Sequence, residues 1–183
     1  MTRLITTILC CVLGTTLAAA ADLNETTKEA ALRLLLSEVQ PGAMASEQYC
    51  TLVFADRHFH SERATRKLGK DRERKVYEGA LSDADWNALT GVLDSKEFRA
   101  LDVPQVVPPL MIEDAHTITI SVARDTKFQN MEFLTNRSRK PYEQQVSPLL
   151  KWWKSFRSGR RAESSAPPDE RCSLDNTHAV FAH

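Results

Sequence analysis

Residues 116–134 read HTITISVARDTKFQNMEFL, and this stretch contains the clearest secondary-structure pattern in the chain. Apolar side chains occupy every second position from 118 to 122, so one face of a strand is apolar and the other is polar. Asp125-Thr126 can turn the chain, and residues 127–134 return as the partner strand. The stretch therefore predicts a β-hairpin with one apolar face that packs against another layer.

A second hairpin is predicted upstream of the first. Gln48–Phe54 alternates and is rich in residues that favour strands, and polar extended sequence continues from there to about Lys67. Leu68–Asp71 has the composition of a turn, and Glu73–Ala80 returns as the partner strand. The segment from 48 to 80 thus indicates one long hairpin.

Two helices are expected before and after this long hairpin. Leu23–Val39 carries one apolar stripe at the spacing i, i+3, i+4 and i+7, and Pro41-Gly42 ends it. The stripe consists of Leu32, Leu35, Leu36 and Val39. Ser82 and Asp85 fit a capping box, which marks the start of a second helix. A short helical turn around Phe98 follows this second helix.

A third helix is predicted over Pro141–Phe156, with an interruption at Ser147-Pro148 as an open alternative. Its apolar stripe is formed by Leu149, Trp152, Trp153 and Phe156. Adjacent helical residues point about 100° apart, so only one of Trp152 and Trp153 can point fully into a core. The other tryptophan is expected at the rim.

The predicted elements follow the order α-ββ-α-ββ-α. Because each hairpin is followed by a helix, no parallel crossover is required. We therefore predict an α+β fold in which an antiparallel sheet of two β-hairpins has helices packed on one face. A single domain is expected over residues 22–158. Residues 159–183 are rich in Arg, Ser, Pro and Asp and are expected to form a mobile C-terminal tail.

Residues 1–21 have the pattern of a cleavable secretory signal peptide. One arginine precedes the apolar run Leu4–Leu17, and Ala18–Ala21 offers the small residues that a signal peptidase reads. A membrane anchor would need roughly 20 apolar residues, and lipid attachment at Cys10 or Cys11 would need a small residue before the cysteine. We expect a secreted or periplasmic protein, bacterial in type, without a transmembrane segment after cleavage.

Signal cleavage would leave Cys50 and Cys172 in the mature chain. An oxidising compartment favours a disulfide between them over two free thiols. In the chain-entropy model a bond that closes so long a loop contributes about 4–5 kcal/mol. The whole chain balances 24 Lys and Arg against 24 Asp and Glu, which argues against a general nucleic-acid binder.

Four residues with metal-binding side chains alternate along the polar segment: Asp56, His58, His60 and Glu62. A regular strand would place all four on one face, and imidazole and carboxylate groups are ligands for Zn²⁺. The same pattern fits the solvated face of a hairpin. A metal-dependent hydrolase that uses His58 and His60 is therefore the alternative interpretation.

Residues 62–75 hold seven basic side chains against three acidic ones. The basic residues are Arg63, Arg66, Lys67, Lys70, Arg72, Arg74 and Lys75. This excess of positive charge is suited to an anionic protein or polymer of the cell envelope or extracellular space. Charge of this kind also keeps an exposed sheet edge from pairing with other chains.

Recognisable catalytic patterns such as G-x-S-x-G, H-E-x-x-H or a Walker loop do not occur in the sequence. The glycines are too scattered to cradle a phosphate, so no catalytic residue and no cofactor is predicted. The first interpretation is a non-enzymatic binding protein of the cell envelope or extracellular space. A purely structural envelope protein is a third interpretation.

Three short patterns follow one another along the chain: YEGALS at 77–82, ITISV at 118–122 and LLKWW at 149–153. Through them Tyr49–Phe156 resembles a family of small exported domains of soil bacteria that has no assigned activity. The resemblance implies the arrangement hairpin–helix–hairpin–helix. It transfers no functional residue.

Overall fold

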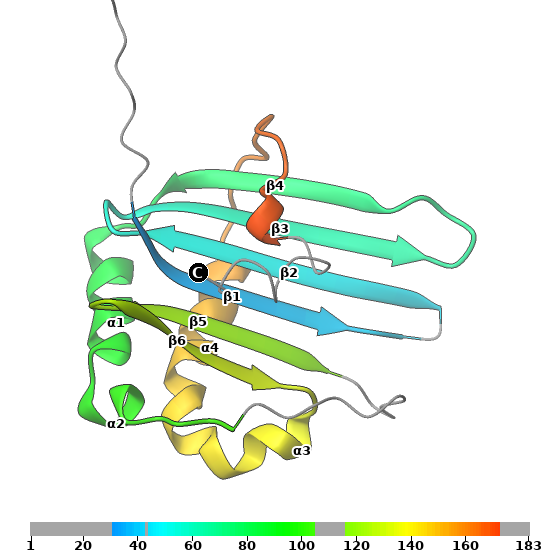
Figure 1. Ribbon diagram of the computed structural model, residues 1–183. Helices are drawn as coiled ribbons and strands as arrows, with labels where there is room; N and C mark the ends of the chain where they lie inside the picture. The colour runs from blue at the N-terminus through cyan, green and yellow to red at the C-terminus, as the bar shows by residue number, and fades with distance from the viewer. Residues whose placement is uncertain (1–30, 43, 105–115, 173–183) are drawn as a thin grey trace, which may run out of the picture.

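A computed structural model describes residues 31–42, 44–104 and 116–172, and its centre is one antiparallel sheet with helices on one face (Figure 1). The strands are β1 (Leu32–Gln40), β2 (Ala45–Phe54), β3 (His58–Lys67), β4 (Glu73–Ala80), β5 (Thr117–Arg124) and β6 (Lys127–Phe133). The helices are α1 (Asp83–Leu93), α2 (Lys96–Arg99), α3 (Asn136–Arg139) and α4 (Glu143–Ser158), with the short 3₁₀ turns η1 (Lys140–Tyr142) and η2 (Glu170–Cys172). The six strands lie in the order β4-β3-β2-β1-β5-β6.

Strand β1 overturns the helix expected at Leu23–Val39 over the residues that the structure describes, and the first part of that prediction, 23–30, lies outside them. Leu34, Leu35 and Leu36 are all fully buried, as a strand covered on both faces allows. Leu34 and Leu36 face the helices, whereas Leu35 faces the opposite side of the sheet. A short continuous apolar run satisfies helical spacing by accident, and periodicity alone cannot assign it. The α+β class is confirmed, but the strands come first, so the predicted order α-ββ-α-ββ-α is wrong.

The segment expected as one long hairpin forms three strands, β2, β3 and β4. A turn at Ala55–Arg57 separates β2 from β3, and the backbone N–H of Arg57 donates to the Phe54 carbonyl at 3.0 Å. Arg57 has a φ of 72°, a left-handed conformation that glycine or asparagine usually adopts. The turn therefore carries no sequence signal. The second turn, predicted at Leu68–Asp71, is confirmed, with Gly69 at a φ of 70°.

Helix α1 begins where the capping pattern predicts. The Ser82 hydroxyl accepts the backbone N–H of Asp85 at 3.1 Å. Leu89 and Leu93 are fully buried in the core between α1 and the sheet. The short helix α2 forms where the helical turn around Phe98 was expected, and Phe98 is buried. The β5–β6 hairpin is also confirmed.

Helix α4 runs through Pro148 without a break, so the interruption considered at Ser147-Pro148 does not occur. Pro148 removes one backbone hydrogen bond, but Leu149 and Trp153 on the following turns are buried in the core and hold the helix in place. Trp153 is 1% exposed and Trp152 is only partly buried, as the angular argument predicts.

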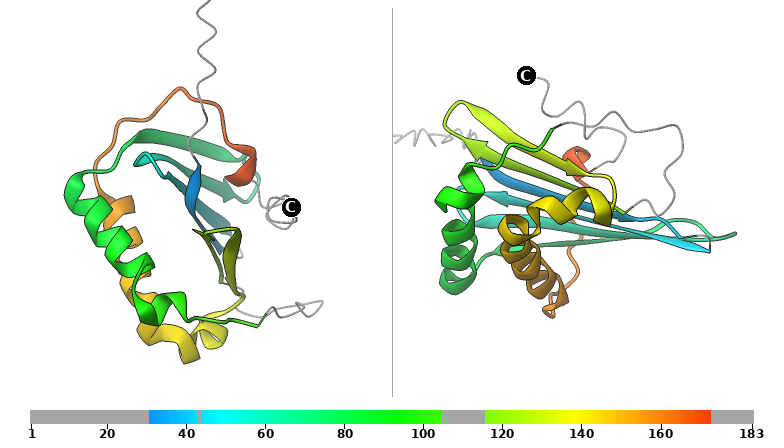
Figure 2. Two further views of the ribbon diagram at one scale, coloured as in Figure 1. Left: turned by 60° about the vertical axis from the view of Figure 1, so that its left-hand side comes forward. Right: turned by 90° about the horizontal axis from the view of Figure 1, so that it is seen from below.

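The sheet is covered on both faces. On one side α1, α2 and α4 pack on the main core, which includes Leu34, Ile120 and Trp153 (Figure 2). On the opposite side, here called the outer face, a smaller cluster contains Leu35, Cys50, Leu52 and Cys172. No helix in the described ranges is long and apolar enough to cross a membrane.

Residues 159–172 are the first part of the region that was expected to be a mobile tail. They cover the outer face of the sheet. They leave α4 on the helix side, pass the edge of β4 and end on the outer face (Figures 1 and 2). The backbone N–H of Ser164 donates to the Val76 carbonyl at 2.8 Å. Cys172 forms the predicted disulfide with Cys50, at a Cα–Cα distance of 5.5 Å. The signal peptide prediction at 1–21 lies outside the described residues.

Candidate functional site

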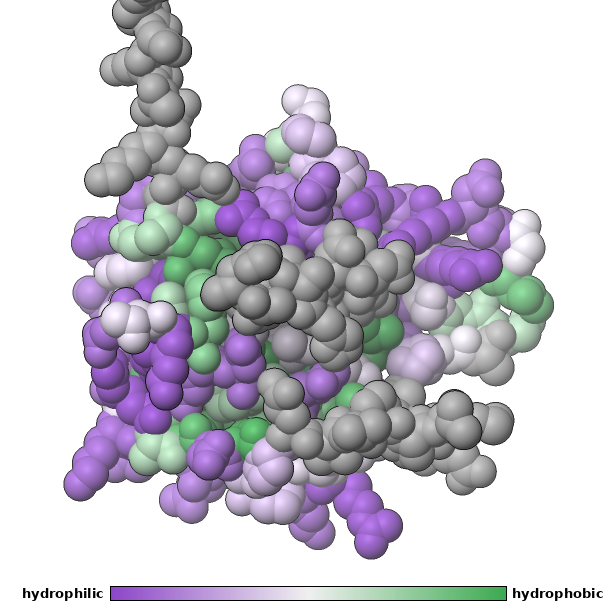
Figure 3. Space-filling model, viewed as in Figure 1, coloured by the Kyte–Doolittle hydropathy of each residue, from purple (hydrophilic) through white to green (hydrophobic). Residues whose placement is uncertain are grey.

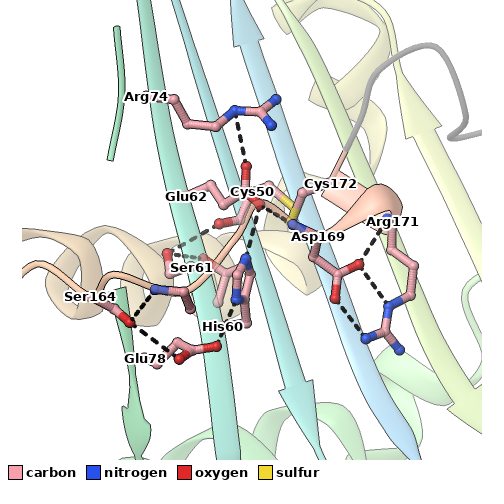
Figure 4. A network of polar contacts seen from close by, with 12 residues as sticks. Cys50, His60, Ser61, Glu62, Arg74, Glu78, Ser164, Asp169, Arg171 and Cys172 are labelled. Atoms are coloured by element: carbon pink, nitrogen blue, oxygen red, sulfur yellow. Dashed lines mark hydrogen bonds and ion pairs between the residues drawn. A yellow bond between two sulfur atoms is a disulfide. The ribbon is translucent and has the colours of Figure 1, made fainter. Parts of the chain in front are cut away.

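A buried polar network lies on the outer face, between β3, β4 and the C-terminal segment 159–172 (Figure 4). The side chains of His60 and Glu62 are only 7% and 4% exposed. His60 Nε2 lies 2.9 Å from Glu62 Oε1, and His60 Nδ1 lies 3.1 Å from Glu78 Oε1. Both ring nitrogens therefore face a carboxylate.

This environment favours the protonated form of His60. Burial lowers the pKa of His60, but hydrogen bonds to Glu62 and Glu78 and the charge of Glu62 outweigh burial and raise the pKa above its ordinary value. An imidazolium can donate to both carboxylates at once, whereas a neutral ring can donate to only one. His60 thus connects β3 with β4 through its contacts with Glu62 and Glu78.

Glu62 also fixes the C-terminal segment. Its Oε1 accepts the backbone N–H of Asp169 at 2.7 Å, and its Oε2 lies 3.3 Å from Arg74 Nε. At the other end of the segment, the Ser164 hydroxyl donates to Glu78 at 3.2 Å. Both acidic partners of His60 therefore hold residues 159–172 against the sheet, and the network has a structural role.

We predict that His60 makes stability depend on pH above about 6.5, the ordinary histidine value. Because folding raises the pKa of His60, its stabilising contribution is complete below that ordinary value and is lost as pH rises through the raised pKa. Urea unfolding from pH 5.5 to 9.5 should show the free energy of unfolding of the wild type falling relative to that of His60→Gln. The exposed His58→Gln is the matched control and should follow the wild type. Parallel curves for wild type and His60→Gln would contradict the prediction.

The four residues expected to share a metal are separated into two pairs. Asp56 lies in the β2–β3 turn rather than on a strand, and its Oδ2 is 3.0 Å from Nδ1 of the exposed His58. His60 and Glu62 lie under the C-terminal segment. Within the described ranges, the candidate ligand atoms that gather within 4.8 Å are those of His60, Glu62 and Cys172, and the Cys172 sulfur is bonded to Cys50.

The seven basic residues of the 62–75 segment do not form one surface. Arg63 pairs with Glu47 at 3.0 Å and Arg74 pairs with Glu62. Arg72 contacts Gln48, and Lys75 lies 3.4 Å from Glu163. The other three, Arg66, Lys67 and Lys70, are exposed beside the β3–β4 turn and form no ion pair with another described residue.

A cleft of about 330 Å³ opens on the helix side, between β2, β3 and β4 and the C-terminal end of α4. Tyr49 and Tyr77 form part of its wall on the sheet. The basic side chains that line it are Arg63 from β3 and Lys154, Arg157 and Arg161 from the end of α4 and the residues that follow. Segments about 100 residues apart in sequence thus create one basic, partly aromatic cleft.

Arg157 is the most tightly held of these basic groups. Its guanidinium carbon lies 4.1 Å from the centre of the Tyr49 ring and 4.2 Å from that of Trp153. It also pairs with the buried Glu38, which His116 contacts at 2.7 Å. Burial raises the pKa of Glu38, but these hydrogen bonds and the Arg157 charge outweigh it, so the pKa is lowered. Arg157 is therefore preorganised before any ligand arrives.

Two of the four cations that line the cleft are not paired with a carboxylate. Arg63 and Arg157 have carboxylate partners, whereas Lys154 and Arg161 form no ion pair with a described residue. Arg161 packs 3.8 Å from the centre of the Phe156 ring and donates to the Phe156 carbonyl. The cleft therefore presents hydrogen-bond donors and positive charge to a ligand.

The sequence identified only part of this cleft. Of the residues expected to bind an anionic partner, which are Arg63, Arg66, Lys67, Arg72 and Arg74, only Arg63 lines it. The basic spacing of 154, 157 and 161 at the end of the last helix is a signal that sequence analysis could have used. The position of Tyr49 opposite that helix end carries no local signal.

The chain matches no protein-family model, and a search of curated proteins gives no significant match. The function must therefore be inferred from the geometry of the residues themselves.

Proposed function

We propose that this protein is an exported, non-enzymatic binding domain whose ligand is an anionic protein or polymer of the cell envelope or extracellular space. The ligand lies in the cleft between β2–β4 and α4. The observation that carries the proposal is that Lys154 and Arg161 line the cleft without an ion-pair partner among the described residues, beside Arg63 and Arg157, which are paired with Glu47 and Glu38. The Glu62 carboxylate is engaged on the outer face with His60 and Asp169, so it does not neutralise the cleft.

The functional groups in the cleft suit binding. Guanidinium and ammonium groups donate strong hydrogen bonds to carboxylate, phosphate or sulfate oxygens. The cleft volume of about 330 Å³ corresponds to one acidic unit, such as an acidic sugar ring or an acidic side chain of a larger partner. Tyr49 and Tyr77 add apolar surface beside the charged groups. The cleft thus holds one unit while the rest of a polymer or protein extends beyond it.

Lys154 offers a direct test, because it lines the cleft, is exposed and has no ion-pair partner in the described ranges. We expect Lys154→Glu to weaken binding of a polyanion by about tenfold, equivalent to 1.4 kcal/mol. The matched control is Lys151→Glu, on the same helix but outside the lining, which should bind like the wild type.

Three probes cover the ligand chemistry: a uronic acid polysaccharide, a polyglycerol phosphate and polyglutamate. Titration calorimetry at about 50 and 300 mM salt should show weaker binding at the higher concentration, because dissolved ions screen the attraction between opposite charges. The probe with the highest affinity identifies carboxylate or phosphate as the recognised group. Binding that Lys151→Glu and Lys154→Glu reduce equally, or no binding of any probe at low salt, would overturn the proposal.

A further inference from the structure

The end of the sheet farthest from the helices carries two exposed large apolar side chains. Met44 and Leu68 are 70% and 72% exposed, and they are the only large apolar side chains of the described residues that are exposed to this degree. Met44 belongs to the β1–β2 connection and Leu68 to the β3–β4 turn. The backbone N–H of Leu68 donates to the Met44 carbonyl at 3.0 Å, so the two connections are joined.

This end projects beyond the helical layer (Figures 1 and 2). The β2–β3 ladder continues to the pair Ala45–Lys67, so the apolar residues follow directly on regular sheet. A shallow hollow of about 430 Å³ lies between the two connections. The structure therefore holds both apolar side chains at the tip, and binding there needs no change of fold.

Unpaired positive charge surrounds the two apolar residues. Arg66, Lys67 and Lys70 line the same hollow and form no ion pair with another described residue. Asp71 is the single acidic residue of that lining, which leaves an excess of two positive charges. Figure 3 shows the same pattern at this end of the molecule, where apolar surface lies beside strongly hydrophilic residues.

Apolar side chains at an extremity, flanked by lysine and arginine, match the chemistry of an anionic lipid surface. Short apolar groups enter the boundary between headgroups and acyl chains, while the basic groups remain among the phosphates. A protein partner would require a much larger complementary area than two side chains provide. Single exposed apolar residues are common, but a joined pair at a projecting tip is not explained by packing.

We propose that the tip cluster, defined as Met44, Arg66, Lys67, Leu68 and Lys70, docks this protein on an anionic lipid bilayer. Met44 and Leu68 enter the interface, and the three basic side chains contact headgroup phosphates. The tip cluster shares no residue with the lining of the cleft. Lipid docking is therefore a second binding function, separate from the anionic ligand proposed for the cleft.

The test is sedimentation of the mature chain with large vesicles of phosphatidylcholine alone or with about 30% phosphatidylglycerol, at 100 mM salt. We expect binding to the anionic vesicles and none to the neutral ones. Met44→Ser with Leu68→Ser should reduce partitioning about tenfold while the melting temperature stays unchanged, because both side chains are exposed. Lys67→Glu with Lys70→Glu should abolish binding.

Two controls separate this docking from other effects. Lys127→Glu with Lys140→Glu makes the same charge change at exposed positions away from the tip and should retain binding. Lys154→Glu should also retain binding, so failure of the cleft and failure of the tip are distinguishable. Leu68→Trp should show a blue shift of fluorescence on anionic vesicles, relative to the wild type, if the tip is inserted.

Three outcomes would overturn the proposal. Equal binding to neutral and anionic vesicles would show that the basic side chains of the tip cluster do not contribute to binding. Binding that survives the paired serine substitutions, without a spectral shift of Leu68→Trp, shows adsorption by charge alone and no insertion. Absence of binding to the anionic vesicles would show that the tip cluster does not dock on lipid.

Discussion

Replacing both Cys50 and Cys172 with alanine is expected to lower the free energy of unfolding by about 5 kcal/mol. The two cysteines are 122 residues apart in sequence, so the bond removes a large part of the conformational freedom of the unfolded chain. In the folded state the bond also holds the C-terminal segment over Leu35 and Leu52. A loss of this size is comparable to the total stability of many domains of this length.

Urea unfolding of oxidised wild type and of the double variant measures the effect. A reductant should lower the stability of the wild type to that of the double variant and leave the double variant unchanged. Each single substitution already breaks the bond, so the single and double variants should differ little. Unfolding midpoints that coincide for oxidised wild type and double variant would refute the expectation.

Trp153→Ala is expected to lower the free energy of unfolding by about 3–5 kcal/mol, which is among the largest effects of truncating one side chain. Trp153 is 1% exposed, and its indole N–H donates to the Thr51 hydroxyl at 2.8 Å. The Thr51 hydroxyl lies 2.9 Å from that of Ser61, which donates to the Cys50 carbonyl at 3.1 Å. Truncation therefore leaves a cavity and removes the polar connection between α4 and the centre of the sheet.

Two variants separate these contributions. Trp153→Phe keeps most of the apolar volume but lacks the N–H donor, so it should cost less, with about 0.5–1.5 kcal/mol from the hydrogen bond and a further part from lost volume. Trp152→Ala, at the partly buried neighbouring position, should cost clearly less than Trp153→Ala. A Trp152→Ala variant as unstable as Trp153→Ala would show that α4 is oriented differently from the arrangement described.

Elements with local signals were predictable from the sequence. The β5–β6 hairpin has an alternating strand and a polar turn, and α1 has its cap at Ser82. Each depends on residues within a few positions of one another. Their existence and type follow from local chemistry, whatever the rest of the chain does.

Elements that depend on distant segments were not predictable. Leu35 is buried because residues 159–172 bring Cys172 onto the outer face, which no pattern near Leu35 indicates. The turn at Ala55–Arg57 forms with an arginine in a conformation typical of glycine. Burial on both faces is thus the reason that β1 was not predicted as a strand. The turn at Ala55–Arg57, which has no sequence signal, is the reason that the expected long hairpin forms three strands.

The candidate sites show the same division. Alternation placed His60 and Glu62 on one face, and both side chains do contact each other there. Their other partners, Glu78 and Asp169, come from the adjacent strand and from the C-terminal segment. The cleft needs a helix end more than 90 residues beyond Tyr49, so its residues could be named only once the fold was known.

The contact between Ser164 and Val76 has a consequence for self-association. Strand β4 lies at one edge of the sheet, and such an edge offers unpaired backbone groups to which a strand of another molecule can add. At this edge the backbone N–H of Ser164 already donates to the Val76 carbonyl, and the Cys50–Cys172 bond keeps residues 159–172 close to the sheet. After reduction of that one bond, the cover of this edge would rest only on noncovalent contacts, such as those of Ser164 with Glu78 and of Asp169 with Glu62.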